Sequence, residues 1–181
     1  MRVRNRWGVA LFALVFAFVN ARIAHAQNLL IPMDDGQRNH LKAYGVTYLA
    51  LKTGQKAEWL LNYRGGAFLL PDAPDLRRRA ALDGVSVEAI SDGALAAARA
   101  EIAGANMDVV VLERAPKIAI YRPANQPPWD DAVTLALTYA GIDFTSVWDD
   151  QVMKGELSKY DWVHLHHEDF TGQFNKLFLA Y

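Results

Sequence analysis

Short apolar runs alternate along the chain with longer segments in which apolar residues recur at helical spacing. The apolar runs have the length and composition of β-strands and lie at 29–33, 57–63, 85–90, 108–112, 117–121, 144–148 and 162–166. The periodic segments predict helices at 37–52, 72–83, 92–103 and 129–140. Local signals agree with these bounds, because Ser91 is suited to cap the third helix and Gly84 and Gly141 follow the ends of two others.

This alternation predicts an α/β fold in which a mostly parallel sheet is flanked by helices. Strands joined through helices by short connections are typical of parallel neighbours with right-handed crossovers, as in a flavodoxin-like sheet. A proline-rich stretch places a break between two half-units near 113–128. The chain closes on the apolar run 174–181 without a polar tail, so we expect an N-terminal fragment whose fold is incomplete at its C-terminus.

Residues 1–26 have the pattern of a secretion signal. Arginines come first, an apolar stretch follows at 9–19, and Ala24 and Ala26 supply the small residues of a cleavage site. The alternative is a membrane anchor, but the stretch is shorter than the ~20 residues that span a bilayer. We therefore predict a signal peptide over 1–26, an α/β domain over 27–181 with no stable membrane span, and a periplasmic or extracellular location.

Charge and cysteine content narrow the classes of function. Residues 1–26 carry four arginines and no acid, so their removal changes the formal net charge from −1 to −5. A mildly acidic domain without a basic run is a poor partner for nucleic acid. The sequence contains no cysteine, which excludes disulfides, thiolate metal ligands and a cysteine nucleophile within this chain.

Polar clusters follow several of the predicted strands. Ligands in an open α/β sheet bind beyond the carboxyl ends of the strands, so we expect these clusters to meet at one edge and bind a small polar ligand. The ligand-binding candidates are Asp34, Asp35, Arg64, Gly65, Gly66, Trp129 and Asp130.

Each of these clusters also has a structural interpretation. The glycines beside Arg64 let backbone N–H groups approach an anion, but they also suit a plain turn into 68–70. Asp34 and Asp35 are suited to bind a cation or an amine, and equally to favour the start of the next helix through its dipole. The helix-start interpretation applies to Asp130 as well.

The densest cluster of titratable side chains is 164–169, after the last predicted strand. Its catalytic candidates are His166, His167, Glu168 and Asp169. His164 and His166 lie two apart on a strand and share a face, so with Glu168 they form a candidate ligand set for a divalent metal. The alternative is a polar pocket or a hydrogen-bonded structural network. No cofactor other than a divalent metal is suggested.

Four segments carry a resemblance to a known family. Residues 31–45, 59–66, 128–135 and 160–173 resemble exported bacterial proteins labelled "asparagine synthetase B". Segment 117–165 resembles the start of a class I glutamine-amidotransferase-like α/β domain. The resemblance implies glutamine-dependent amide transfer or ligation. The cysteine nucleophile and the S-G-G-x-D-S loop that such enzymes use are not present in this sequence.

Three hypotheses for the function follow. The first is an exported amidotransferase-like protein that binds a small polar ligand at the carboxyl ends of its strands. The second is a metal-assisted hydrolase in which the histidine-rich cluster activates water. The third is the amidotransferase or ligase that the family label implies. The serine-hydrolase elbow, the P-loop and the dinucleotide fingerprint have no counterpart in the sequence.

Overall fold

The computed structural model describes residues 28–122 and 132–165, and every structural statement below concerns those residues. The strands are β1 (Asn28–Ile31), β2 (Ala57–Leu61), β3 (Ala67–Pro71), β4 (Glu88–Ile90), β5 (Asp108–Leu112), β6 (Ile118–Tyr121), β7 (Thr145–Val147) and β8 (Trp162–Leu165). The α-helices are α2 (His40–Lys52), α3 (Pro74–Asp83), α4 (Asp92–Ala103), α5 (Ala132–Ala140) and α6 (Asp149–Met153), with 3₁₀ turns η1 (Tyr63–Gly65) and η2 (Glu156–Lys159).

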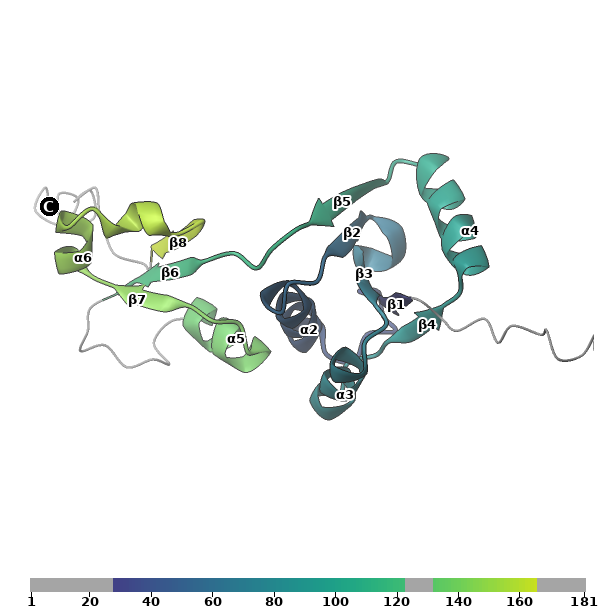
Figure 1. The fold of residues 1–181 in the computed structure, drawn as a ribbon, viewed down its shortest axis with the longest axis horizontal. Helices are drawn as coiled ribbons and strands as arrows, with labels where there is room; N and C mark the ends of the chain where they lie inside the picture. Colours follow the sequence, from purple (N-terminus) through teal and green to yellow (C-terminus); the bar gives the residue numbers. More distant parts are fainter. Residues whose placement is uncertain (1–27, 123–131, 166–181) are drawn as a thin grey trace, which may run out of the picture.

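The strands form two separate sheets that lie side by side along the long axis of the molecule (Figure 1). The larger sheet has the order β4-β1-β3-β2-β5, and each neighbouring pair in it is antiparallel. Its first part runs β–α–β–β–α–β with the two helices as crossovers, which is the split-βαβ connectivity of a ferredoxin-like unit. Strand β5 then extends the sheet beside β2.

This finding corrects the expected fold class. The sheet is not mostly parallel and flavodoxin-like, because five of the eight described strands lie in an antiparallel sheet and three form a small parallel one. The helical crossovers do join parallel strands, but an antiparallel strand lies between the two strands of each pair. β3 separates β1 from β2, and β1 separates β3 from β4.

The antiparallel pairing of β2 and β3 arises at the turn that begins at Asn62. The chain reverses there through η1, with positive φ at Asn62 (62°), Arg64 (48°), Gly65 (77°) and Gly66 (89°). This left-handed backbone sends residues 67–71 back along β2 as β3, with Trp59 opposite Phe68. The sequence pattern indicated a turn into 68–70 but no strand there, so the strand that makes the sheet antiparallel was missed.

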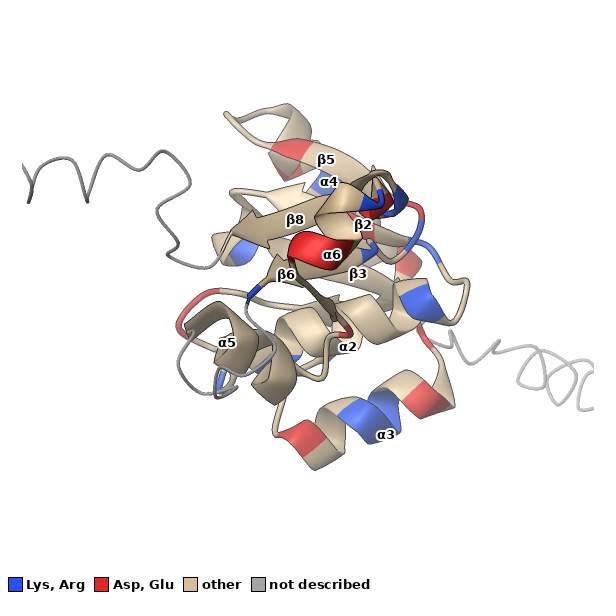
Figure 2. Ribbon diagram, turned by 90° about the vertical axis from the view of Figure 1, so that its left-hand side faces the viewer, with Lys and Arg blue, Asp and Glu red and all other residues tan. Residues whose placement is uncertain are grey.

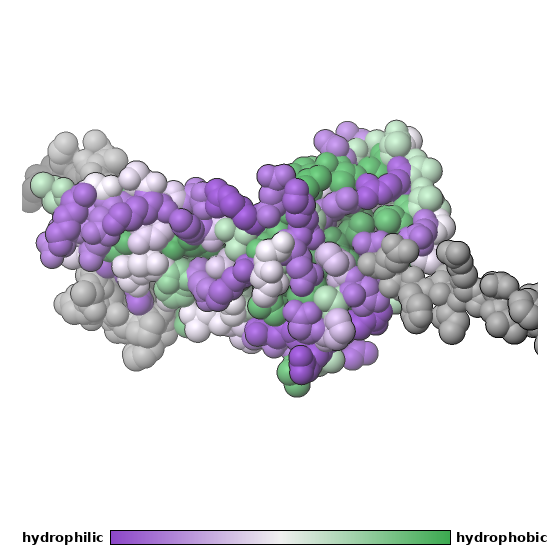
Figure 3. All heavy atoms as spheres, viewed as in Figure 1, coloured by the Kyte–Doolittle hydropathy of each residue, from purple (hydrophilic) through white to green (hydrophobic). Residues whose placement is uncertain are grey.

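Helices cover both faces of the larger sheet. Side chains alternate along β1, so that Leu29 and Ile31 pack under α2 and α3 while Leu30 faces α4. Helix α4 crosses from the β4 edge to the β5 edge, and its Arg99 reaches Glu58 on β2 at 2.7 Å. On the face drawn in Figure 3, hydrophobic residues gather around β5 and α4.

The smaller sheet is parallel, with the order β7-β6-β8. Ile118, Ile120 and Leu137 form the core beneath α5, and Ala119, Tyr121 and Val147 form the core on the opposite face, against the segment around α6 and η2. The crossovers from β6 to β7 and from β7 to β8 therefore lie on opposite faces, as in a doubly wound sheet.

Two of the features that join the sheets are a chain connection and a helix crossing. The first is the connection 113–117 from β5 to β6, where Arg114 donates to both carboxylate oxygens of Asp161 at 2.6 Å. The second is the crossing of α2 and α5, where Gly45 lies so close to Ala140 that an added Cβ would come within 1.9 Å of the Ala140 carbonyl oxygen. The small residue is thus required for this contact between helices.

Candidate functional site

The expected site residues are divided between the two sheets. Asp34, Asp35, Arg64, Gly65 and Gly66 belong to the antiparallel sheet, and His164 lies on β8 of the parallel sheet. The remaining candidates lie outside the described residues, and these are Trp129, Asp130, His166, His167, Glu168 and Asp169.

Asp34 and Arg64 meet at one edge of the antiparallel sheet. The Arg64 Nε atom donates to Asp34 Oδ2 at 2.5 Å, and the two Nη atoms donate to Glu88 at 3.0 and 3.2 Å. The hydrogen bond from Arg64 holds the pKa of Asp34 below its ordinary value, and Asp34 in turn raises the pKa of the guanidinium. Three separate segments are tied together by this cluster.

The neighbouring glycines serve the turn. Gly65 packs against the backbone of Met33, and a Cβ there would lie 2.5 Å from the Met33 carbonyl carbon and oxygen. The Met33 N–H donates to the Arg64 carbonyl at 2.9 Å, which fixes the same contact. Asp35 is exposed. Because Arg64 is already paired with two carboxylates, the local arrangement is that of a structural brace.

A different arginine lies at the carboxyl end of the parallel sheet. Arg122 directly follows β6, the central strand, and its backbone N–H donates to the Val147 carbonyl at 2.9 Å. Its Nε donates to the Ser146 hydroxyl at 2.9 Å. Its Nη1 is buried and has no hydrogen-bond partner within 28–122 and 132–165. A buried guanidinium nitrogen without an acceptor is costly, so it indicates a place for one.

Aromatic and acidic side chains surround the same edge. The ring of Tyr121 lies 4.7 Å from that of Trp148, and the Tyr121 hydroxyl donates to the Asp149 carboxylate. Figure 2 looks onto the parallel sheet from the side of α6, whose acidic residues are red. The carboxyl edge therefore combines Arg122, whose hydrogen bonding is incomplete, with the Tyr121 hydroxyl and the rings of Tyr121 and Trp148. The Asp149 carboxylate lies there too and already accepts a hydrogen bond from Tyr121.

His164 lies one strand away, opposite Ile120 in the register of β6 and β8. It is half-buried, with its ring 6.3 Å from that of Trp162. Within 28–122 and 132–165, no three His, Cys, Asp or Glu side chains are grouped closely enough to hold a metal ion. The expected metal set of His164, His166 and Glu168 includes two residues outside the described part, so it stays a prediction.

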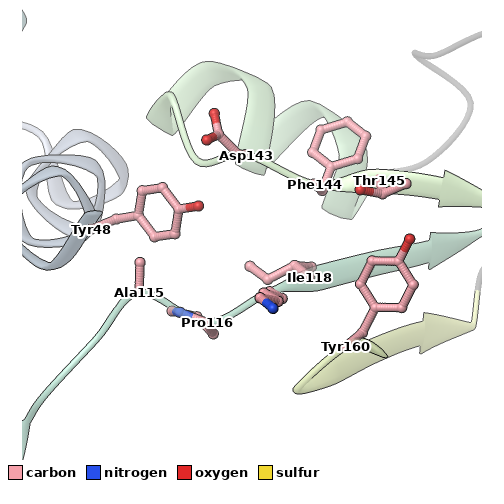
Figure 4. A pocket seen from close by; sticks show the side chains of 9 residues that line it. Tyr48, Ala115, Pro116, Ile118, Asp143, Phe144, Thr145 and Tyr160 are labelled. Carbon is pink, nitrogen blue, oxygen red and sulfur yellow. The ribbon is translucent and has the colours of Figure 1, made fainter. Parts of the chain in front are cut away.

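A cavity of about 310 Å³ opens at the amino ends of the parallel strands, between the two sheets (Figure 4). Tyr48 enters it from α2, Asp143 and Phe144 from the turn before β7, and Tyr160 from the loop before β8. Burial raises the pKa of the Tyr48 hydroxyl, and the negative charge of Asp143 adds to this effect. Asp143 itself pairs with Lys52 of α2 at 2.5 Å.

Sequence reasoning placed Arg122 in the polar cluster that follows a strand but did not name it as a binding candidate, and it missed this cavity. Arg122 carried one usable signal, because it directly follows a predicted strand. The cavity has no comparable signal, since its lining comes from four segments whose tyrosines and apolar residues look like ordinary core positions. Only the packing of α2 against the second sheet brings them together.

Comparison of the chain with protein-family models, with curated proteins and with solved structures found no match in any of the three. Within the described residues, no helix combines the length and apolar character needed to cross a bilayer. The function is therefore argued from the geometry of these sites.

Proposed function

We propose that this protein binds a small anionic ligand at the carboxyl ends of its parallel strands, with Arg122 as the anchoring residue. The observation that carries the proposal is the buried Nη1 atom of Arg122, which lacks an acceptor while Nε is held by Ser146. A carboxylate or phosphate oxygen placed there would complete the guanidinium, and charge-assisted hydrogen bonds of this kind are stronger than neutral ones.

The position of Arg122 supports this assignment. The crossovers from β6 to β7 and from β7 to β8 lie on opposite faces of the parallel sheet, and ligands of such sheets usually bind beyond the carboxyl ends of the strands, where Arg122 lies. The backbone bond from Arg122 to Val147 and the side-chain bond to Ser146 fix the arginine against β7. The site is thus preorganised on strand ends.

We further propose that the ligand is met outside the cytoplasm, because residues 1–26 have the pattern of a signal peptide. Binding rather than a named reaction is proposed, since the described residues at this edge do not form a nucleophile–base pair. Ser146 instead accepts a hydrogen bond from Arg122.

The test is a thermal-shift and calorimetric titration of the mature protein with inorganic phosphate and with succinate. A bound anion at ten times its Kd raises the free energy of unfolding by about 1.4 kcal/mol. We expect Arg122→Met to weaken binding by about 10- to 100-fold, because it removes charge-assisted hydrogen bonds.

Arg99→Met is the matched control, because Arg99 pairs with Glu58 on the other sheet. It should leave anion binding unchanged. Equal binding to the Arg122→Met protein, or no binding of either anion to the parent protein, would reject the proposed site.

A further inference from the structure

Two cavities adjoin each other between the sheets, the first with a mixed polar and apolar lining and the second with an apolar lining. The first is the 310 Å³ cavity of Figure 4, which we name the polar cavity. The second, the apolar cavity, has a volume of about 260 Å³ and is lined by Leu41, Tyr44, Tyr48, Pro116, Ile118, Ala136, Leu137, Ala140, Ile142 and Trp162. Tyr48, Pro116 and Ile118 line both, so one molecule can extend from the first into the second.

We infer that this pair of cavities is a binding site for an uncharged amphipathic small molecule, with a hydroxyl-bearing head in the polar cavity and an apolar ring or short chain in the apolar one. The site is independent of Arg122, since it lies at the amino ends of strands whose carboxyl ends carry the anion site. The volume of the polar cavity alone lies at the lower end of the range for small-molecule pockets. Such pockets often lie at interfaces between structural units, as this one does.

The polar cavity offers hydrogen-bonding groups together with aromatic faces. The hydroxyl of Tyr48 points into it, and the rings of Phe144 and Tyr160 enclose the opposite side (Figure 4). Thr145 adds a hydroxyl, and Lys117 adds a donor at the exposed rim. Hydroxyl groups of a ligand can both donate to and accept from such a lining, while its C–H face rests on the rings.

The two acidic side chains in this region favour an uncharged head over a cationic one. The Asp143 carboxylate already pairs with Lys52 at 2.5 Å, and Asp161 beside the cavity pairs with Arg114 at 2.6 Å. A carboxylate with a cationic partner can still accept a hydrogen bond from a hydroxyl, whereas a charged ligand would have to compete with the existing pair.

The apolar cavity explains side chains that the fold leaves exposed. Leu41 and Tyr44 on α2 are 44 % and 45 % exposed, and Trp162 on β8 is 44 % exposed. Together they border a space with apolar walls. Exposed apolar side chains gathered around one cavity mark a binding surface more often than scattered ones do, and a ligand ring placed there would remove them from water.

The experiment uses phenyl β-D-glucopyranoside as the probe, with glucose and phenol as its two halves. Binding to the mature protein is measured by calorimetry and by tryptophan fluorescence. We expect the glucoside to bind about tenfold or more tightly than either half, because it fills both cavities at once. Equal affinity for glucoside and phenol, or no binding of any probe, would overturn the inference.

Substitutions of residues that line the two cavities test where the glucoside binds. Trp162→Ala and Tyr48→Phe should each weaken glucoside binding, by about tenfold and several-fold respectively, through loss of apolar contact and of one hydroxyl. Trp59→Ala is the matched control, because Trp59 is 38 % exposed but lines neither cavity. Arg122→Met should bind the glucoside normally. Binding that Trp162→Ala and Tyr48→Phe leave intact contradicts the assignment, provided that circular dichroism shows both variants folded.

Discussion

At the scale of single residues, two arginines illustrate opposite uses of the same side chain. Arg64 donates to Asp34 and Glu88 and thereby ties the end of β1 to the start of β4. Arg122 is held by Ser146 through Nε, while Nη1 stays without an acceptor. A guanidinium has five N–H donors in a fixed plane, so the paired donors of Arg64 brace the fold, whereas the unpaired Nη1 of Arg122 is the basis of the anion site proposed above.

The lowered pKa of Asp34 predicts that the protein loses stability at acid pH. Its pKa in the folded protein lies below the ordinary value of 3.8, chiefly because of the hydrogen bond from Arg64. A lowered folded pKa stabilises the protein above the unfolded pKa, and the stabilisation is lost as pH falls through the folded value. Urea unfolding from about pH 6 to about pH 3 should therefore show stability decreasing toward the acid end.

Asp34→Asn should be less stable than the parent near neutrality, and the difference should shrink as pH falls. Asp35→Asn is the control, because the exposed Asp35 side chain is outside the cluster. A constant difference between Asp34→Asn and the parent over the whole range would show that the Asp34 charge does not contribute.

Residue type alone could identify Arg64 as a candidate but could not rank it against Arg122. The glycines at 65 and 66 suggested an anion loop, and the structure shows that their positive φ values serve the turn into β3. The partners of Arg64 lie 30 and 24 positions away along the chain. Local sequence gives no information on such partners, so it could not show that the guanidinium is already occupied.

At the scale of elements, most helices and strands could be predicted but their pairing could not. The helix predicted over 92–103 is confirmed at both ends, because Ser91 accepts a hydrogen bond from Ala94 and the helix ends before Gly104. The strand predicted over 108–112 is confirmed as β5. Apolar periodicity reports which residues are buried, but it does not say whether a neighbouring strand runs parallel or antiparallel.

Gly45→Ala tests the contact between α2 and α5. A Cβ would lie 1.9 Å from the Ala140 carbonyl oxygen, and that backbone atom cannot turn aside as a side chain could. We expect a loss of about 1–3 kcal/mol in the free energy of unfolding, as is typical of overpacking. Gly93→Ala in α4 is the matched control, since a Cβ there meets nothing within 4 Å. Equal stability of the two variants would contradict the close approach.

At the scale of the whole molecule, the two sheets are joined by a short connection and a helix crossing. Asp161 secures the connection, because it accepts two hydrogen bonds from Arg114 and one from the Lys117 backbone at 2.8 Å. The polar and apolar cavities lie beside this connection, so whatever holds it also fixes their shape. The sequence placed a break near 113–128, but it could not show two sheets of different kinds on either side.

Asp161→Asn should loosen the connection and expose it to trypsin, which cuts after Arg114 and Lys117. We expect cleavage at these two bonds to be several-fold faster than in the parent, measured by limited proteolysis and mass spectrometry. Glu113→Gln is the control, because Glu113 pairs only with the exposed Lys56 at 3.4 Å in the described structure. Unchanged cleavage in Asp161→Asn would mean that the ion pair does not hold the connection.

The interior position of β1 also bears on the order in which the chain can fold during synthesis. β1 is the first of the described strands to be made, yet its partners are β3 and β4, so it stays unpaired until Pro71 and then Ile90 have been added. Leu29, Leu30 and Ile31 are buried in the folded sheet, so these side chains lack their packing partners during that interval. The antiparallel sheet therefore cannot close around β1 until β4 has been made.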